Sequence, residues 1–91
     1  MRLWFENSNG ERKHLSQVFD INETWKIIDN FLKEHNYKSY YTRFWFDDSK
    51  LELWIDVGSH SEFFIVTGFV DKESSFLNNF LNITKGENQD G

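Results

Sequence analysis

The fold of this chain is decided by residues 40–57, YYTRFWFDDSKLELWIDV, where large apolar and polar side chains alternate most clearly. A period of two is typical of β-strands, because successive side chains point to opposite faces of a sheet. The polar run from Asp47 to Lys50 separates two such segments and predicts a turn. We therefore expect residues 40–47 and 51–57 to form a β-hairpin.

The hairpin pattern predicts an apolar core face and a mixed second face. The pairs expected on the core face are Phe46 with Leu51, Phe44 with Leu53, and Thr42 with Ile55. The pairs expected on the second face are Trp45 with Glu52, Arg43 with Trp54, and Tyr41 with Asp56. A third strand is expected over residues 63–70, after the turn at residues 58–61. Pairing Val57 with Glu62 sends Phe64 to the core face and Ile65 to the second face.

Upstream, residues 2–6 and 11–19 are expected to form another hairpin, because Asn9-Gly10 is a strong turn signal. With a two-residue loop, Glu6 lies opposite Lys13 and Trp4 opposite Leu15. A helix follows, since Asp20 and Glu23 have the spacing of a capping box. The apolar stripe that predicts this helix consists of Ile21, Trp25, Ile28 and Leu32, and Asn36 is a plausible left-handed stop.

Downstream, a short helix is expected after Asp71, with an apolar stripe of Phe76, Leu77, Phe80 and Leu81. Residues 84–91 are polar and are expected to be a disordered tail. The 91 residues allow one domain, which we place at residues 1–83. The element order ββαβββα predicts an α+β fold with an antiparallel sheet, one long amphipathic helix and a short C-terminal helix.

The composition limits the classes of function. Cysteine is absent, which excludes disulfides, thiolate metal sites and cysteine nucleophiles. No apolar run approaches the roughly 20 residues that span a bilayer, so we expect a cytoplasmic protein without membrane contact. The net charge of -5 disfavours direct binding to nucleic acid. This charge either keeps the protein soluble or complements a basic partner, such as the nucleic-acid groove of another protein.

The second face is the first candidate site. Its expected members are Tyr41, Arg43, Trp45, Trp54, Phe63 and Ile65. Large apolar side chains there need a cover, and the C-terminal stripe is one candidate. The alternative is an open aromatic platform with Arg43 stacked on Trp54, a kind of patch that marks protein interfaces or ligand stacking.

The second candidate site is the segment 56–62, which brings Ser59 and His60 between the carboxylates of Asp56 and Glu62. Backbone amides and hydroxyls could bind an anion there, and His60 could exchange a proton near neutral pH. The same residue types are ordinary in turns, so a plain hairpin loop, an interaction loop and a catalytic loop all fit. No paired spacing of metal ligands and no phosphate loop is present, and we expect no cofactor and no metal.

Three segments carry a resemblance to known proteins: residues 3–10 (LWFENSNG), 37–45 (YKSYYTRFW) and 54–64 (WIDVGSHSEFF). They resemble small uncharacterised proteins encoded by phages and prophages of Gram-positive bacteria, over roughly residues 1–66. The resemblance implies a phage setting, in which small acidic non-enzymatic proteins often bind and block host proteins, including defence nucleases of the CRISPR type. It gives weight to Lys38, Tyr40, Tyr41, Thr42, Arg43, Asp56, Gly58, Ser59, His60 and Glu62.

The sequence therefore predicts a protein–protein interaction module, not an enzyme, that inhibits or redirects a host protein. The expected contact residues are Tyr41, Arg43, Trp45, Trp54, Asp56, Ser59, His60 and Glu62. One alternative is a nucleotide or small-ligand sponge, in which Arg43, Ser59 and His60 hold an anion. Another is a structural or replication accessory protein. We expect a monomer or a small homo-oligomer.

Overall fold

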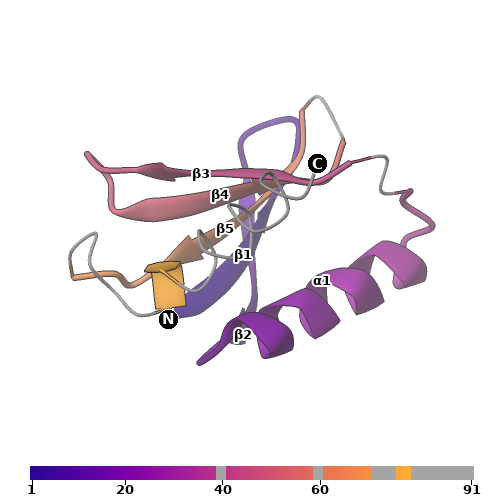
Figure 1. Cartoon of the computed structure of the whole chain (residues 1–91). Coiled ribbons are helices and arrows are strands. Elements are labelled where there is room, and N and C mark those ends of the chain that lie inside the picture. The colour runs from indigo at the N-terminus through magenta and orange to yellow at the C-terminus, as the bar shows by residue number, and fades with distance from the viewer. Residues whose placement is uncertain (39–40, 59–60, 71–75, 79–91) are drawn as a thin grey trace.

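Five strands pair into one antiparallel sheet in the order β2-β1-β5-β4-β3 (Figure 1). They are β1 Arg2–Glu6, β2 Arg12–Gln17, β3 Arg43–Asp47, β4 Glu52–Asp56 and β5 Phe63–Thr67. The helix α1, Ile21–Glu34, lies along one side of the sheet. The computed structural model describes residues 1–38, 41–58, 61–70 and 76–78. The expected α+β class and the order of the strands and the long helix are confirmed.

Helix α1 begins and ends where the sequence predicts. The Asp20 side chain accepts a hydrogen bond from the Glu23 backbone N–H at 2.8 Å, as an N-cap does. At the other end, Asn36 is left-handed with φ 55°, and the Tyr37 N–H donates to the Leu32 carbonyl at 2.9 Å. This pattern is a Schellman motif, which stops the helix and turns the chain back towards the sheet.

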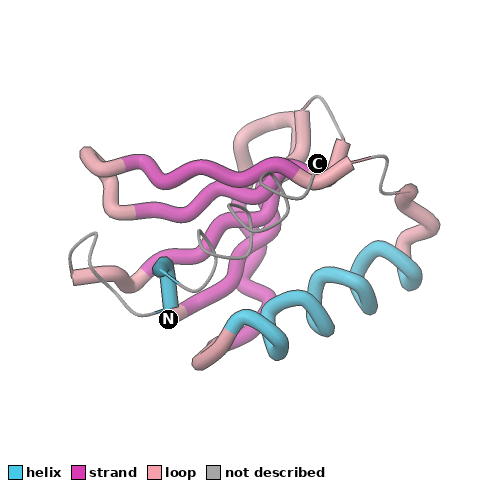
Figure 2. Tube along the Cα trace, in the orientation of Figure 1, coloured by secondary structure: helices cyan, strands magenta, loops and turns pink. Residues whose placement is uncertain are grey.

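The core lies between α1 and one face of the sheet. The buried side chains of this core come from the strands, from α1, from the connecting segments and from residues 76 and 77. They are Leu3, Val18, Ile28, Phe31, Leu32, Leu53, Ile55, Val57, Phe64, Val66, Phe69, Phe76 and Leu77. Residues 76–78 are helical (Figure 2). Because Phe76 and Leu77 belong to this core, they pack on the same face as α1 and not on the second face.

The remaining C-terminal expectations concern other residues. Phe80 and Leu81 of the apolar stripe lie outside the described residues, as do residues 84–91, for which a tail is expected. The fifth strand ends at Thr67, earlier than expected. Gly68 follows it with φ 100°, and a Cβ at this glycine would meet the Met1 backbone at 3.3 Å. Glycine therefore suits both the backbone conformation and the close approach of the N-terminus.

The predicted register of the first hairpin is wrong by one residue near the turn. The loop contains three residues, Ser8 to Gly10, with Gly10 at φ 81°, so Glu6 pairs with Arg12 and Trp4 with His14. The Asn7 side chain accepts hydrogen bonds from two backbone N–H groups of this turn, at 2.9 and 3.0 Å. A bulge between Leu3 and Trp4 absorbs the extra residue.

The predicted register of the second hairpin is wrong by two residues. Leu51 is left-handed with φ 54° and joins the loop, so Trp45 pairs with Trp54 and Arg43 with Asp56. A shift of two keeps every side chain on its expected face. The register between β4 and β5 is the one expected, with Ile55 opposite Phe64.

We expect Phe64→Ala to lower the free energy of unfolding by about 3–5 kcal/mol, because a buried ring is lost and its cavity does not fully collapse. Phe64 is buried between Phe5 and Phe31, with both ring centroids at 5.5 Å. Urea denaturation followed by circular dichroism measures the change. Val70→Ala, at an exposed position, is the control and should change stability by less than about 0.5 kcal/mol. Equal effects of the two substitutions would contradict the assigned core.

Candidate functional site

A row of large side chains crosses the second face and takes one residue from each strand. Neighbouring pairs in the sheet link His14, Trp4, Ile65, Trp54 and Trp45 in that order. The ring of His14 meets the edge of Trp4 at 5.0 Å, and Trp45 stacks on Trp54 at 6.1 Å. Ile65 lies in the middle of the row and is fully buried. The second face is thus a second, smaller apolar layer built from the sheet itself.

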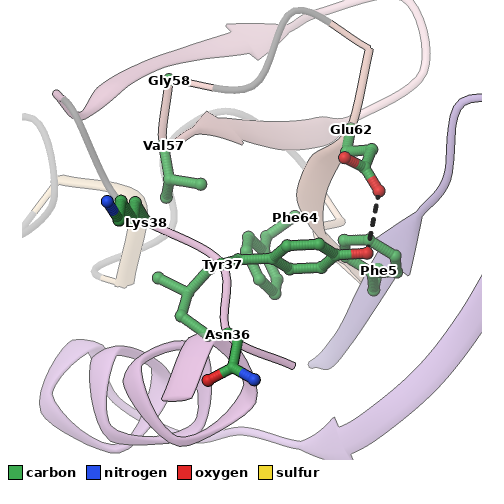
Figure 3. Close-up of a pocket in the computed structure, with 9 residues that line it drawn as sticks. Phe5, Asn36, Tyr37, Lys38, Val57, Gly58, Glu62 and Phe64 are labelled. Carbon is green, nitrogen blue, oxygen red and sulfur yellow. Dashed lines mark hydrogen bonds between the residues drawn. The ribbon is translucent and has the colours of Figure 1, made fainter. Parts of the chain in front are cut away.

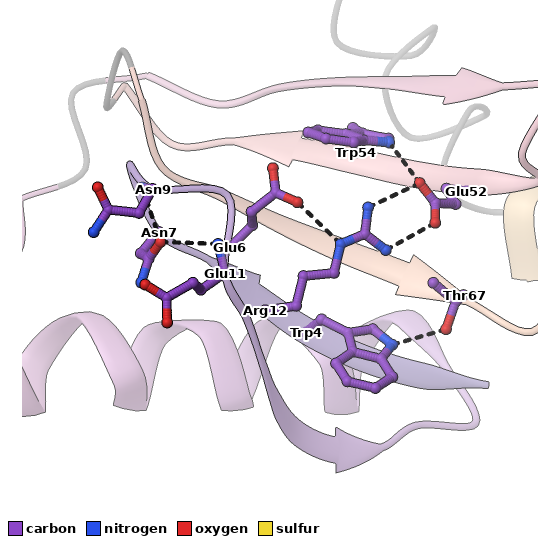
Figure 4. A network of polar contacts seen from close by, with 9 residues as sticks. All are labelled: Trp4, Glu6, Asn7, Asn9, Glu11, Arg12, Glu52, Trp54 and Thr67. Atoms are coloured by element: carbon purple, nitrogen blue, oxygen red, sulfur yellow. Dashed lines mark hydrogen bonds and ion pairs between the residues drawn. The ribbon is translucent and has the colours of Figure 1, made fainter.

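Arg12 lies on this face between Glu6 and Glu52 (Figure 4). Its Nε donates to Glu6 Oε1 at 3.0 Å, and its two terminal nitrogens donate to the Glu52 oxygens at 2.8 and 3.1 Å. The guanidinium also lies 5.7 Å from the Trp54 ring centroid, and the Trp54 Nε1–H donates to Glu52 Oε1 at 3.3 Å. Arg12 therefore links edge strand β2 to β4 across the two strands between them.

The ion pair between Arg12 and Glu52 is strong for its position near the surface. The hydrogen bonds from Arg12 lower the pKa of the Glu52 carboxyl below its ordinary value of 4.5. The same bonds raise the pKa of Arg12, so both groups are charged at neutral pH. A bidentate pair of this kind fixes the direction of the guanidinium as well as its charge.

Towards β3, the second face ends in a partly exposed group that we call the aromatic corner: Tyr41, Arg43, Trp45, Trp54 and Phe63. Tyr41 and Trp45 are each 42% exposed. Trp45 meets Phe63 edge-on at 6.0 Å, in addition to its stack on Trp54. The described residues thus leave Trp45 and Tyr41 open to solvent, while α1, Phe76 and Leu77 occupy the opposite face. Of the two expectations for this face, the structure favours the open one at the β3 end.

Arg43 has a different partner from the one expected. It does not stack on Trp54; its Nη2 donates to Asp56 Oδ2 at 2.8 Å, and its guanidinium lies 5.2 Å from the Tyr41 ring centroid. Asp56 is only 2% exposed and also accepts a bond from the Gly58 N–H at 2.9 Å. The pair with Asp56 and the contact with Tyr41 raise the pKa of Arg43. The cation that does lie over Trp54 is Arg12.

Glu62 lies away from the aromatic corner, on a cavity of about 340 Å³ beneath the C-terminal end of α1 (Figure 3). The cavity is lined by Phe5, Leu32, Asn36, Tyr37, Lys38, Val57, Gly58, Glu62 and Phe64. The Tyr37 hydroxyl donates to Glu62 Oε2 at 3.3 Å, and the charge of Glu62 raises the pKa of Tyr37. The floor is apolar and the rim is polar, which is the usual make-up of a small-molecule site.

The structure thus divides the expected site residues between two places. Tyr41, Arg43, Trp45, Trp54 and Asp56 are brought together at the aromatic corner, Glu62 lies at the cavity, and Ser59 and His60 lie outside the described residues. Sequence reasoning missed Arg12 and Tyr37. Arg12 reaches the second face only because the first turn has three residues. Tyr37 could have been found from the left-handed stop at Asn36, which turns the following residue back onto the helix end.

We expect Glu52→Gln to lower the free energy of unfolding at pH 7 by about 1–2 kcal/mol, because Arg12 loses a charged bidentate partner. Since the pKa of Glu52 is lowered in the folded state, its contribution is present above pH 4.5 and is lost as pH falls through the folded value. Urea denaturation of both proteins at several pH values measures this.

The stability difference between wild type and Glu52→Gln should therefore shrink below pH 4.5. Glu11→Gln removes a charge from an exposed residue next to β2 and serves as the control, with an expected change below about 0.5 kcal/mol at pH 7. A difference that stays constant down to about pH 3 would contradict the role of the ion pair.

Within residues 1–38, 41–58, 61–70 and 76–78, no group of three or more His, Asp or Glu side chains is arranged to hold a metal ion. In the same part of the chain no helix is both long and apolar enough to cross a membrane. No protein-family model, no curated protein and no solved structure matches this chain.

Proposed function

We propose that this protein is a phage-encoded, non-catalytic binding module that attaches to a host protein through the aromatic corner and inhibits or redirects it. The observation that carries the proposal is the exposure of Trp45 and Tyr41, each 42%, beside a fixed arginine at the edge of the sheet. Tryptophan, tyrosine and arginine supply most of the binding energy in protein interfaces. The setting comes from the resemblance of residues 1–66 to phage and prophage proteins.

Rigidity supports this proposal. Trp45 is stacked on Trp54 and braced by Phe63, and Arg43 is anchored on buried Asp56. Side chains that are held in place before binding lose little conformational entropy in the complex, so more of their contact energy appears as affinity. The corner is therefore better suited to a specific contact than three mobile surface side chains would be.

Charge supports a basic partner. The chain carries -5 at neutral pH, and Asp47 and Asp48 stand two and three residues after Trp45, at the end of β3 and in its turn. Carboxylates at the rim of an aromatic patch favour a partner with Lys and Arg around an apolar centre. Proteins that bind nucleic acids have such surfaces, and host defence nucleases of the CRISPR type are members of this class.

We expect Tyr41→Ala/Trp45→Ala to weaken binding to the host partner by about tenfold or more, because both residues lie at the proposed contact centre. Tagged wild type and variant are used for affinity capture from a lysate of a Gram-positive host, and mass spectrometry identifies the retained proteins. Added single-stranded DNA should displace a partner that is held through its nucleic-acid surface.

Phe19→Ala is the matched control, because Phe19 is an exposed aromatic residue far from β3 that precedes α1. It should retain the same partner as wild type. A partner that binds the double variant as well as wild type would contradict the proposed contact surface. If DNA does not displace the partner, the contact through the aromatic corner stands, but the partner does not bind through a nucleic-acid groove.

The cavity beside Glu62 supports a second candidate function, the binding of a small molecule. Its volume of about 340 Å³ lies within the range of small-ligand sites, roughly 300–1,000 Å³. The nucleotide sponge expected from the sequence needs Arg43 at the anion and either Trp54 or Tyr41 at the base. Arg43 and Trp54 lie on the other face of the sheet, and the ring of Tyr41 lies against Arg43. The lining instead suits a compact ligand with an apolar body and a hydrogen-bond donor for Glu62.

We expect denaturation of purified wild type to release such a molecule, and Leu32→Phe to release none, because the larger side chain occupies the cavity. Mass spectrometry of the protein-free fraction measures this, and circular dichroism checks that the variant folds. Release of the same molecule from both proteins would place it elsewhere. Release from neither would leave the cavity unoccupied in the host and count against this second function.

A further inference from the structure

The two edges of the sheet are built differently. Edge strand β2 carries Arg12 and Lys13, and its pairing with β1 is interrupted by a bulge. Charged side chains and bulges are the usual devices that keep a sheet edge from pairing with another chain. Edge strand β3, Arg43–Asp47, pairs with β4 without interruption and carries three aromatic residues in succession. Of the two edges only β2 has a bulge in its pairing, and the charged side chains of β3 stand at its two ends.

The sequence of β3, RFWFD, is complementary to itself when reversed. Trp45 is at the centre, with Phe44 and Phe46 on either side, and the two ends carry opposite charges. If two β3 strands pair antiparallel about Trp45, each Arg43 faces the Asp47 of the other copy, and each Phe44 faces a Phe46. Opposite charges and aromatic pairs at facing positions stabilise such a pair of strands.

We infer that the partner of edge strand β3 is a second copy of this chain, joined antiparallel about a two-fold axis at Trp45. The two sheets then form one continuous sheet of twice five strands. An isologous contact of this kind closes on itself and stops at the dimer. In an antiparallel pair, facing residues alternate between hydrogen-bonded and non-hydrogen-bonded pairs. With the axis at Trp45, the outward N–H and C=O groups of β3 find partners whichever kind of pair the two Trp45 residues form.

The side chains of β3 are placed for this contact. Arg43 donates to Asp56 from Nη2, and 65% of its side chain is exposed. The bonds that Asp47 accepts from Ser49 and Lys50 end on Oδ1. Phe44 and Phe46 pack against the core but are only partly buried, so a facing copy would cover more of both rings.

This inference is independent of the host partner, although both involve Trp45. In the dimer, facing residues lie on the same side of the sheet, so the aromatic corners of the two copies become neighbours across the axis. A dimer would thus present one doubled aromatic surface. Dimerisation is measured on purified protein alone, so its outcome does not depend on whether a host protein is captured.

The test uses sedimentation velocity from about 10 μM to about 1 mM. The mass of wild type should rise with concentration from 11.0 kDa towards twice that value. Trp45→Lys and Trp45→Glu should each stay monomeric, because like charges then face each other at the axis. An equimolar mixture of the two variants should form a dimer again, because lysine then faces glutamate. Both variants lose the same tryptophan, so only the facing charges differ.

Lys13→Glu on edge strand β2 is the control and should dimerise as wild type does. Wild type that is monomeric at every concentration would overturn the inference, as would variants that still dimerise alone or a mixture that does not associate. Circular dichroism establishes that each variant folds. If one does not, hydrogen exchange of wild type decides: the β3 amides must exchange more slowly at high concentration than at low, and equal rates overturn the inference.

Discussion

Both faces of this five-stranded sheet carry large apolar side chains that must be shielded from water, and the described part of the chain has one long helix with which to do it. Helix α1, together with Phe76 and Leu77, covers one face. On the other face the cover consists of side chains of the sheet itself. They are the row of large residues that contains Trp4, Trp54 and Trp45, and the long side chain of Arg12. The bidentate bond from Arg12 to Glu52 is what holds that cover in place.

The side chain of Arg12 can extend over only part of the sheet, and this explains where the exposed aromatic residues lie. Arg12 starts on β2 and extends as far as Glu52 on β4, so β1, β5 and β4 lie beneath it or beside it. Strand β3 lies beyond that reach. Trp45 therefore has neighbours on one side, Trp54 and Phe63, and solvent on the other. The exposure of the aromatic corner therefore follows from the position of Arg12 at the far edge of the sheet.

The sequence predicts those parts of this arrangement that depend on parity and local capping. Asp20 and Asn36 mark the helix ends by local hydrogen bonds, and a two-residue error at Leu51 leaves Trp45 on its correct face. The first turn could not be predicted in the same way. A third loop residue there moves Arg12 to the second face, and its bonds to Glu52 join residues 40 apart in the sequence. Contacts at that separation depend on the assembled sheet, which no local pattern encodes.

Asp56 couples the two candidate sites, although they lie on opposite faces. Its carboxylate is buried, binds Arg43 of the aromatic corner through Oδ2, and accepts the N–H of Gly58 on the cavity through Oδ1. Gly58 has φ 103°, so the backbone at the cavity rim depends on both the glycine and this bond. Removing Arg43 would leave a buried charge without its cation and disturb the rim as well. A loss of function at Arg43 would therefore not identify the site responsible, whereas Tyr41 and Trp45 can be changed without touching this carboxylate.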